Sequence, residues 1–218
     1  MLYQNRRHAG NLLAVRLGKY ANAGNVIVLA LPRGGVPVGF EIAAALCVPL
    51  DVFIVRKLGT PGQEELAMGA IASGGTRVIN ERIVRALGIP QWAIDEVVSR
   101  ELGELERREL KFHSGAYAGQ LSDKVVILVD DGLATGASMR AAIRAINLQN
   151  PEFLVAAVPV GDFGTCRELE HEVDELCCLA TPQPFEGVGK WYTDFTQTSD
   201  DEVSALLEMA RRLTHDAA

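Results

Sequence analysis

Cysteine, aromatic residues and long apolar runs are scarce in this chain of 218 residues. The four cysteines include no CxxC pair, which disfavours a structural zinc site and a disulfide framework. We expect small buried hydrophobic residues at Cys47, Cys166, Cys177 and Cys178. No apolar segment approaches the length of a membrane span or suits the core of a signal peptide. We therefore expect a cytoplasmic protein with no membrane partner.

Positive charge is also in short supply. The chain has 21 lysine and arginine residues against 28 aspartate and glutamate residues, a formal net charge of −7. This balance opposes a general attraction to polyanions, so we expect no nucleic acid partner. Any phosphate site must be local and built from particular basic residues.

Hydrophobic residues make up 48% of the chain, enough for a substantial core, and the length suits a single domain. Apolar runs of strand length alternate with segments of helical periodicity. This alternation predicts an α/β fold with a doubly wound, mainly parallel central sheet flanked by helices. The expected strands are 26–31, 50–55, 125–129, 153–159 and 175–179, and the expected helices are 8–22, 40–46, 81–87, 90–111, 139–146, 165–173 and 199–213.

Residues 125–138 combine three features of a binding site. The predicted strand runs into the acidic pair Asp130 and Asp131 where it must leave the sheet. A loop with glycines and hydroxyl side chains follows, and the next helix would present unpaired N–H groups. The combination predicts a place for a phosphate at one end and a polyol at the other.

A second glycine-rich turn follows the first predicted strand. Gly34 and Gly35 allow backbone N–H groups to approach a ligand closely, and Arg33 adds a positive charge beside them. The alternative is an ordinary strand-to-helix turn with an arginine that faces solvent.

Two other segments each have two interpretations. After Arg56 and Lys57, residues 58–75 are rich in glycine, which suits a lid with hinges, or a surface hairpin in which 67–72 pairs with 76–80. Near the C-terminus, Trp191, Tyr192 and Phe195 gather in a chain that is only 6% aromatic. They would stack on a planar ligand or pack the last helix against the body.

Residues 126–138 resemble the phosphoribosyl-pyrophosphate (PRPP) binding motif of the type I phosphoribosyltransferases: four apolar residues, two acids and a closing Thr-Gly-x-Ser. The turn at 32–35 resembles that family's pyrophosphate loop, and 58–75 takes the place of its flexible loop. The resemblance covers roughly residues 25–160 and is to bacterial members of unassigned base substrate. It implies one domain over 1–218, with a core of about 25–180, a flexible lid loop of about 58–75 and a small hood from about 1–24 and 181–218.

The resemblance also implies roles for individual residues. Asp130 and Asp131 would hold the ribose hydroxyls, because carboxylates only accept hydrogen bonds. Pyrophosphate would be bound by a loop in which the family often has a non-proline cis peptide bond. Arg33 and Lys57 would offset the charge of the leaving group. The remaining expected substrate-binding residues are Gly34 and Gly35 for pyrophosphate, Leu133, Ala134, Thr135, Gly136, Ala137 and Ser138 for the 5-phosphate, Arg56, and Trp191 and Tyr192 for the base.

The implied reaction transfers the 5-phosphoribosyl group of PRPP to a nitrogen of a nucleobase or related heterocycle, with pyrophosphate as product. Mg²⁺ is the implied cofactor, held mainly through PRPP and water, with Asp130 and Asp131 as candidate ligands. A homodimer is expected. The sequence departs from the family pattern at residues 132–134, where a longer polar or β-branched side chain is common.

Two other functions remain open at this point. A non-catalytic PRPP or nucleotide sensor could share the same fold, because fold does not dictate function. An unrelated doubly wound protein could use Asp130 and Asp131 to bind a metal.

Overall fold

The computed structural model describes residues 2–112 and 120–216. A five-stranded sheet of order β2-β1-β6-β7-β8 forms the centre, and all of its neighbouring strands are parallel. This confirms the predicted doubly wound α/β fold. Its strands are β1 (Val26–Ala30), β2 (Leu50–Val52), β6 (Val125–Val129), β7 (Phe153–Val160) and β8 (Glu175–Ala180).

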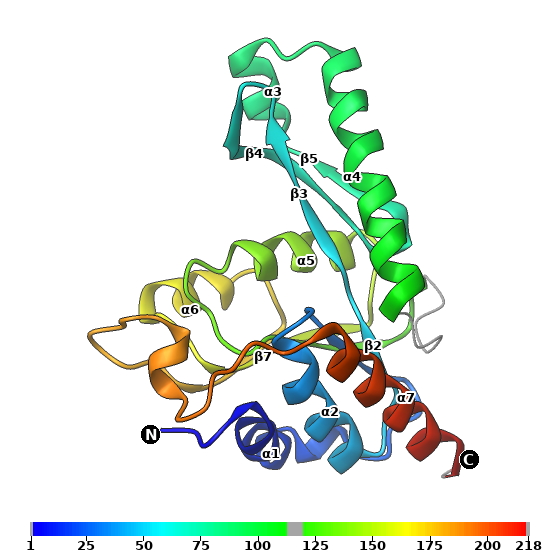
Figure 1. Ribbon diagram of the computed structural model, residues 1–218, viewed down its shortest axis with the longest axis vertical. Helices are drawn as coiled ribbons and strands as arrows, with labels where there is room; N and C mark the ends of the chain where they lie inside the picture. The colour runs from blue at the N-terminus through cyan, green and yellow to red at the C-terminus, as the bar shows by residue number, and fades with distance from the viewer. Residues whose placement is uncertain (1, 113–119, 217–218) are drawn as a thin grey trace.

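Helices cover both faces of this sheet (Figure 1). Alternate residues of β1 belong to different apolar clusters: Val28 packs with α1, α2 and α7, whereas Leu29 packs with α5 and α6. Because successive strand residues point to opposite faces, uniformly apolar strands are what a sheet covered on both sides requires. The helices are α1 (Arg6–Arg16), α2 (Gly35–Leu46), α5 (Ala137–Asn147), α6 (Phe163–Leu169) and α7 (Asp200–Asp216), and the 3₁₀ turns are η1 (Gly18–Tyr20), η2 (Ser73–Gly75) and η3 (Val188–Trp191).

Several predicted boundaries are wrong. The strand expected over 50–55 is divided, because Phe53 still donates its N–H to Ala30 O whereas Ile54 exchanges hydrogen bonds with Ser73 of the 3₁₀ turn that follows β4. The helix expected over 8–22 ends at Arg16 and gives way to η1. The helix expected from 40 begins at Gly35, because Pro37 in its first turn needs no N–H partner.

The predicted lid is regular structure. Strands β3 (Val55–Thr60), β4 (Gln63–Ala72) and β5 (Thr76–Ile79) form an antiparallel sheet, and helices α3 (Glu81–Leu87) and α4 (Gln91–Phe112) follow. The pairing of Ala72 with Thr76 and of Ala70 with Val78 confirms the hairpin interpretation. We call residues 55–112 the arm, which projects from the central sheet (Figure 1).

The two ends of the chain meet beside β7. Tyr3 forms a parallel bridge with Tyr192, and its hydroxyl donates to Pro159 O at 2.6 Å. Tyr3, Ala9, Val160 and Tyr192 form a small apolar cluster, and none of the described side chains of α7 belongs to it. The aromatic residues therefore pack on the N-terminal segment, and the prediction that they pack on the last helix is wrong. None of the helices in the described ranges is long and apolar enough to cross a membrane.

Candidate functional site

The acidic pair and the glycine-rich turn meet at one edge of the central sheet. Strands β1 and β6 are parallel neighbours, so the loops that leave their carboxyl ends emerge side by side. A Cβ atom on Gly34 would lie 2.0 Å from Asp131 Oδ2, and one on Gly35 would lie 2.6 Å from Val129 O. The Pro32–Arg33 peptide bond is cis, as in the pyrophosphate loop that the sequence resembles. Only glycine fits at positions 34 and 35, because any side chain there would clash with residues 129–131.

Gly35 itself is less available than predicted. Its N–H donates to Leu31 O at 3.0 Å as the first turn of α2 forms. A backbone donor that already has a partner contributes little to a ligand. Within this turn, Gly34 is the better-placed glycine for an anion.

Arg6 of α1 completes the acidic pair, and the sequence analysis missed it. Its Nε donates to Asp131 Oδ2 at 2.8 Å, with 11% of the arginine and 16% of the aspartate side chain exposed. Its Nη1 donates to Thr196 O, and its guanidinium lies 3.9 Å from the ring centroid of Phe195. The only sequence signal is an arginine pair ahead of the first helix of an acidic chain.

The electrostatics of the pair follow from burial and proximity. Burial raises the pKa of Asp130 well above its usual value, and the neighbouring Asp131 carboxylate raises it further. Burial also raises the pKa of Asp131, against the hydrogen bond from Arg6, which lowers it. The pair therefore keeps protons to a higher pH than an exposed aspartate does.

The loop after the acids leads into α5, which begins at Ala137, two residues earlier than predicted. Gly136 has a φ of 68°, and a Cβ there would lie 2.8 Å from Thr165 Cγ2, so glycine is required. Ala134, Thr135, Ala137 and Ser138 are exposed around it. The first N–H groups of α5 therefore face an open, neutral loop, an arrangement that suits a phosphate.

Leu133 does not belong to this cradle. Its side chain is 1% exposed, and its N–H donates to Val160 O at 2.9 Å. Gly132 is covered as well, because a Cβ there would lie 2.5 Å from Val188 Cγ1. The unusual residues at 132 and 133 are thus explained by packing against β7 and the hood.

The predicted basic residues lie in three different settings. Arg33 Nη1 lies 3.5 Å from Asp200 Oδ1 at the start of α7. Arg56 of β3 donates twice to Glu101 Oε2 of α4, at 3.0 and 2.6 Å, so it holds the arm together and is not an open ligand. Lys57 follows on β3 with an exposed side chain.

The model of the family described as "Phosphoribosyl transferase domain" matches residues 1–180 of this chain. The chain belongs to the phosphoribosyl transferase domain family. Two Mycobacterium tuberculosis proteins, from strains CDC 1551 and H37Rv, both named "Putative phosphoribosyl transferase", are each 46% identical to it over 211 residues, 97% of this chain and 47% of theirs. The chain thus spans about half the length of these curated relatives.

A crystal structure of TT1426 from Thermus thermophilus shares the fold. It is 38% identical, with a TM-score of 0.83, and the match covers 95% of this chain and 98% of that one. The shared fold thus extends over almost the whole of both chains.

In this phosphoribosyl transferase domain, aromatic residues near the C-terminus contact the backbone and partners of Asp131. Tyr192 is 6% exposed, and its hydroxyl donates to Asp131 O at 2.7 Å. Phe195 stacks on it with the ring centroids 5.0 Å apart. Tyr192 therefore has no open face for a base, and the prediction that it stacks on the ligand is wrong; Trp191 is half-buried.

Asp130 and Asp131 are the candidate metal ligands of the domain. Within residues 2–112 and 120–216, no group of three or more histidine, cysteine or acidic side chains could hold a metal ion. Two adjacent carboxylates suit a hard divalent ion that takes its other ligands from a phosphorylated substrate and from water.

Proposed function

We propose that this chain binds PRPP and transfers its 5-phosphoribosyl group to a nitrogen of a nucleobase or related heterocycle. The observation that supports this proposal is the close approach of Gly34 to Asp131, which would set the proposed pyrophosphate loop beside the acid proposed to bind the ribose diol. The acids would accept hydrogen bonds from the ribose hydroxyls. The loop at 134–138 and the start of α5 would hold the 5-phosphate.

In the proposed reaction, the bond between the anomeric carbon and the diphosphate oxygen breaks, and its electron pair leaves on pyrophosphate. The nitrogen lone pair forms the new bond, and the proton of that nitrogen passes to water. Because no protein nucleophile is required, the chain contributes orientation, charge compensation and exclusion of water. Arg33 and Lys57 are the proposed cations for the leaving group, and the arm takes the place of the predicted lid.

Mg²⁺ would supply charge compensation for the diphosphate when bound at Asp130 and Asp131. A cytoplasmic location and a homodimer stay predictions. Trp92 and Leu110 of α4, with 69% and 89% of their surface exposed, are candidates for the dimer contact.

A cavity of about 320 Å³ is the proposed entrance for the acceptor base. It lies against the N-terminal ends of α1 and α2 and is lined by Arg6, Pro37 and Thr196. Because Arg6 also contacts Asp131, an acceptor in this cavity would lie beside the ribose end of the site. Polar side chains in the wall suit a heterocycle with several hydrogen-bonding atoms.

The decisive experiment is a screen of purines, pyrimidines and simpler nitrogen heterocycles for PRPP-dependent release of pyrophosphate, with Mg²⁺ present. At least one acceptor should give release that disappears in Asp130→Asn/Asp131→Asn. A PRPP-induced rise in melting temperature should accompany it. The proposal would be overturned if no acceptor gave pyrophosphate release and PRPP did not raise the melting temperature.

One observation favours the sensor as a second candidate. Arg6 already occupies one oxygen of Asp131, and a carboxylate with a fixed partner is less free to follow a changing substrate. The sensor predicts a thermal shift with PRPP and no pyrophosphate release with any base. The same screen therefore separates the two functions.

A further inference from the structure

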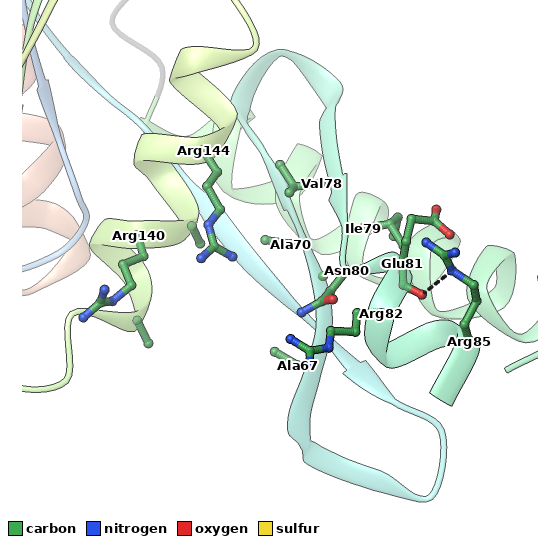
Figure 2. A pocket seen from close by; sticks show the side chains of 13 residues that line it. Ala67, Ala70, Val78, Ile79, Asn80, Glu81, Arg82, Arg85, Arg140 and Arg144 are labelled. Carbon is green, nitrogen blue, oxygen red and sulfur yellow. Dashed lines mark hydrogen bonds between the residues drawn. The ribbon is translucent and has the colours of Figure 1, made fainter. Parts of the chain in front are cut away.

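A second cavity, of about 630 Å³, lies between the arm and helix α5. Strands β4 and β5, the start of α3 and one side of α5 form its walls (Figure 2). Of the residues in the proposed phosphate loop, Ala137 alone reaches it, and neither acid does. The cavity therefore lies apart from the acidic pair and adjoins the proposed phosphate loop only at Ala137.

Four arginines line this cavity in a chain whose net charge is −7: Arg82, Arg85, Arg140 and Arg144. Two of them are hydrogen-bonded to protein acceptors, and a third, Arg144, forms a longer ion pair with Glu172. Arg140 donates to Glu172 and Glu168 at 2.9 and 2.6 Å, and Arg85 Nε donates to Glu81 O at 3.2 Å. These contacts turn the side chains of Arg140 and Arg85 toward protein acceptors. Arg82 and Arg144 are therefore the two guanidinium groups best placed to contact a ligand in the cavity.

Arg82 and Arg144 direct their guanidinium groups into the space between α3 and α5 (Figure 2). Arg144 lies 3.9 Å from Glu172, and Arg82 has no carboxylate partner in the part of the chain that the structure describes. Two cations that face a shared space repel each other, and an anion between them removes that cost. The planar fork of guanidinium donors matches a phosphate group in particular.

The rest of the wall has a different character. Ala70 and Val78 of the arm sheet face Ala141 of α5. Small apolar side chains leave room for an organic group beside the arginines, and the volume lies within the usual range for small-ligand pockets. The cavity lining therefore combines arginine side chains with small apolar ones.

We propose that this cavity binds a small molecule that carries a chain of two or more phosphate groups. The phosphates lie between Arg82 and Arg144, and any organic group lies against Ala70 and Val78. Because Arg82 belongs to the arm and Arg144 to helix α5 on the central sheet, the ligand links the arm to the central sheet and its helices. Binding should therefore slow amide hydrogen exchange in β4 and β5.

Calorimetry on the full chain tests this, with inorganic triphosphate, ATP and inorganic phosphate as separate probes. Triphosphate or ATP should bind, and single phosphate should bind much more weakly. Arg82→Ala/Arg144→Ala should weaken binding by about tenfold or more, since each lost charge-assisted contact is worth roughly tenfold in affinity. Arg212→Ala, at an exposed arginine of α7, is the matched control and should change affinity less than about twofold.

Asp130→Asn/Asp131→Asn distinguishes this cavity from the proposed PRPP site. It should abolish PRPP binding and leave triphosphate binding intact. Stronger binding of ATP than of triphosphate would show that the apolar wall takes part, and equal binding would show that the phosphates suffice. The proposal would be overturned if neither triphosphate nor ATP bound. It would also be overturned if Arg82→Ala/Arg144→Ala left their binding unchanged, or if Asp130→Asn/Asp131→Asn abolished it.

Discussion

Arg6 and Asp131 form the most consequential contact at the scale of single residues. They are 125 positions apart in the chain, mostly buried, and joined at 2.8 Å. A carboxylate in this setting depends on its cation, because desolvation favours the protonated acid. The ribose hydroxyls require the charged, acceptor-only form. Arg6 is thus placed to keep one acid competent for the proposed ligand.

We predict that Arg6→Ala shifts the pH dependence of ribose 5-phosphate binding. As the pH falls through the raised pKa of an acid, its carboxylate is protonated and affinity is lost. Arg6 lowers the pKa of Asp131, so its removal should raise that pKa and move the acid limb to higher pH. Calorimetry between pH 5 and pH 8 measures this. Arg7→Ala, which removes an exposed pair with Glu41, should leave the limb in place; identical profiles for Arg6→Ala and wild type would contradict the assignment.

Gly34→Ala is predicted to abolish PRPP binding. The new methyl group would lie 2.0 Å from Asp131 Oδ2, so the acid or the loop must move. Gly103→Ala in α4 is the control, because a Cβ there meets nothing within 4 Å. The control should stabilise the fold by about 0.5–1 kcal/mol, the usual gain on replacing a helical glycine. Equal PRPP affinity in the two variants would be incompatible with the close approach.

At the scale of elements, the arm is held together by an apolar cluster and by ion pairs between its sheet and α4, Arg56 with Glu101 and Arg77 with Asp95. Leu58, Met68 and Ile71 of its sheet share a cluster with Ile94 and Leu105 of α4. Arg56 adds its two hydrogen bonds to Glu101 beside this cluster. A small sheet gains stability when a helix covers its apolar face. Any movement of the arm should therefore involve sheet and helix together.

Leu105→Ala is predicted to loosen the arm. Leu105 is fully buried, and truncation of such a side chain costs about 2–5 kcal/mol. Leu110→Ala, in the same helix but at a residue 89% exposed, should cost less than about 0.5 kcal/mol. Urea denaturation gives the free energy of unfolding, and hydrogen exchange in β3 and β4 locates the loss. Similar costs for the two variants would mean that α4 does not pack on the sheet as described.

At the scale of the whole molecule, the two ends of the chain are part of the site. Tyr3 pairs with Tyr192, Tyr192 donates to Asp131 O, and Arg6 reaches the same acid from α1. The hood therefore acts on the acids directly, in addition to covering the sheet. Substitutions in the hood that remove these contacts should lower both the stability of the fold and the affinity for ligand.

Tyr192→Phe tests this coupling. Loss of the 2.7 Å hydrogen bond should cost about 0.5–1.5 kcal/mol of stability and reduce ribose 5-phosphate affinity several-fold. Tyr20→Phe removes a bond to Glu175 at the other end of the sheet, and it should lower stability without changing affinity. Melting curves with and without ligand measure both effects. Equal affinity in the two variants would argue against a role for the hood at the site.

Much of the fold could be predicted because its signals are local. Apolar runs identified the strands of the central sheet, and glycine at 88 correctly ended α3, where its φ is 60°. Boundaries failed where long-range pairing decided them, as at Ile54, which leaves β2 to pair with Ser73. The aromatic residues were misassigned for the same reason, since their partner Tyr3 lies at the other end of the chain.

The sequence by itself determined that a strand delivers two acids and a turn of small residues to one sheet edge, because periodicity and glycine positions act over a few residues. Only the tertiary structure decided what surrounds those acids. Arg6 and Tyr192 reach Asp131 across 125 and 61 positions, and Arg82 and Arg144 point into the space between the arm and helix α5. Such contacts depend on how elements pack, which local pattern leaves open.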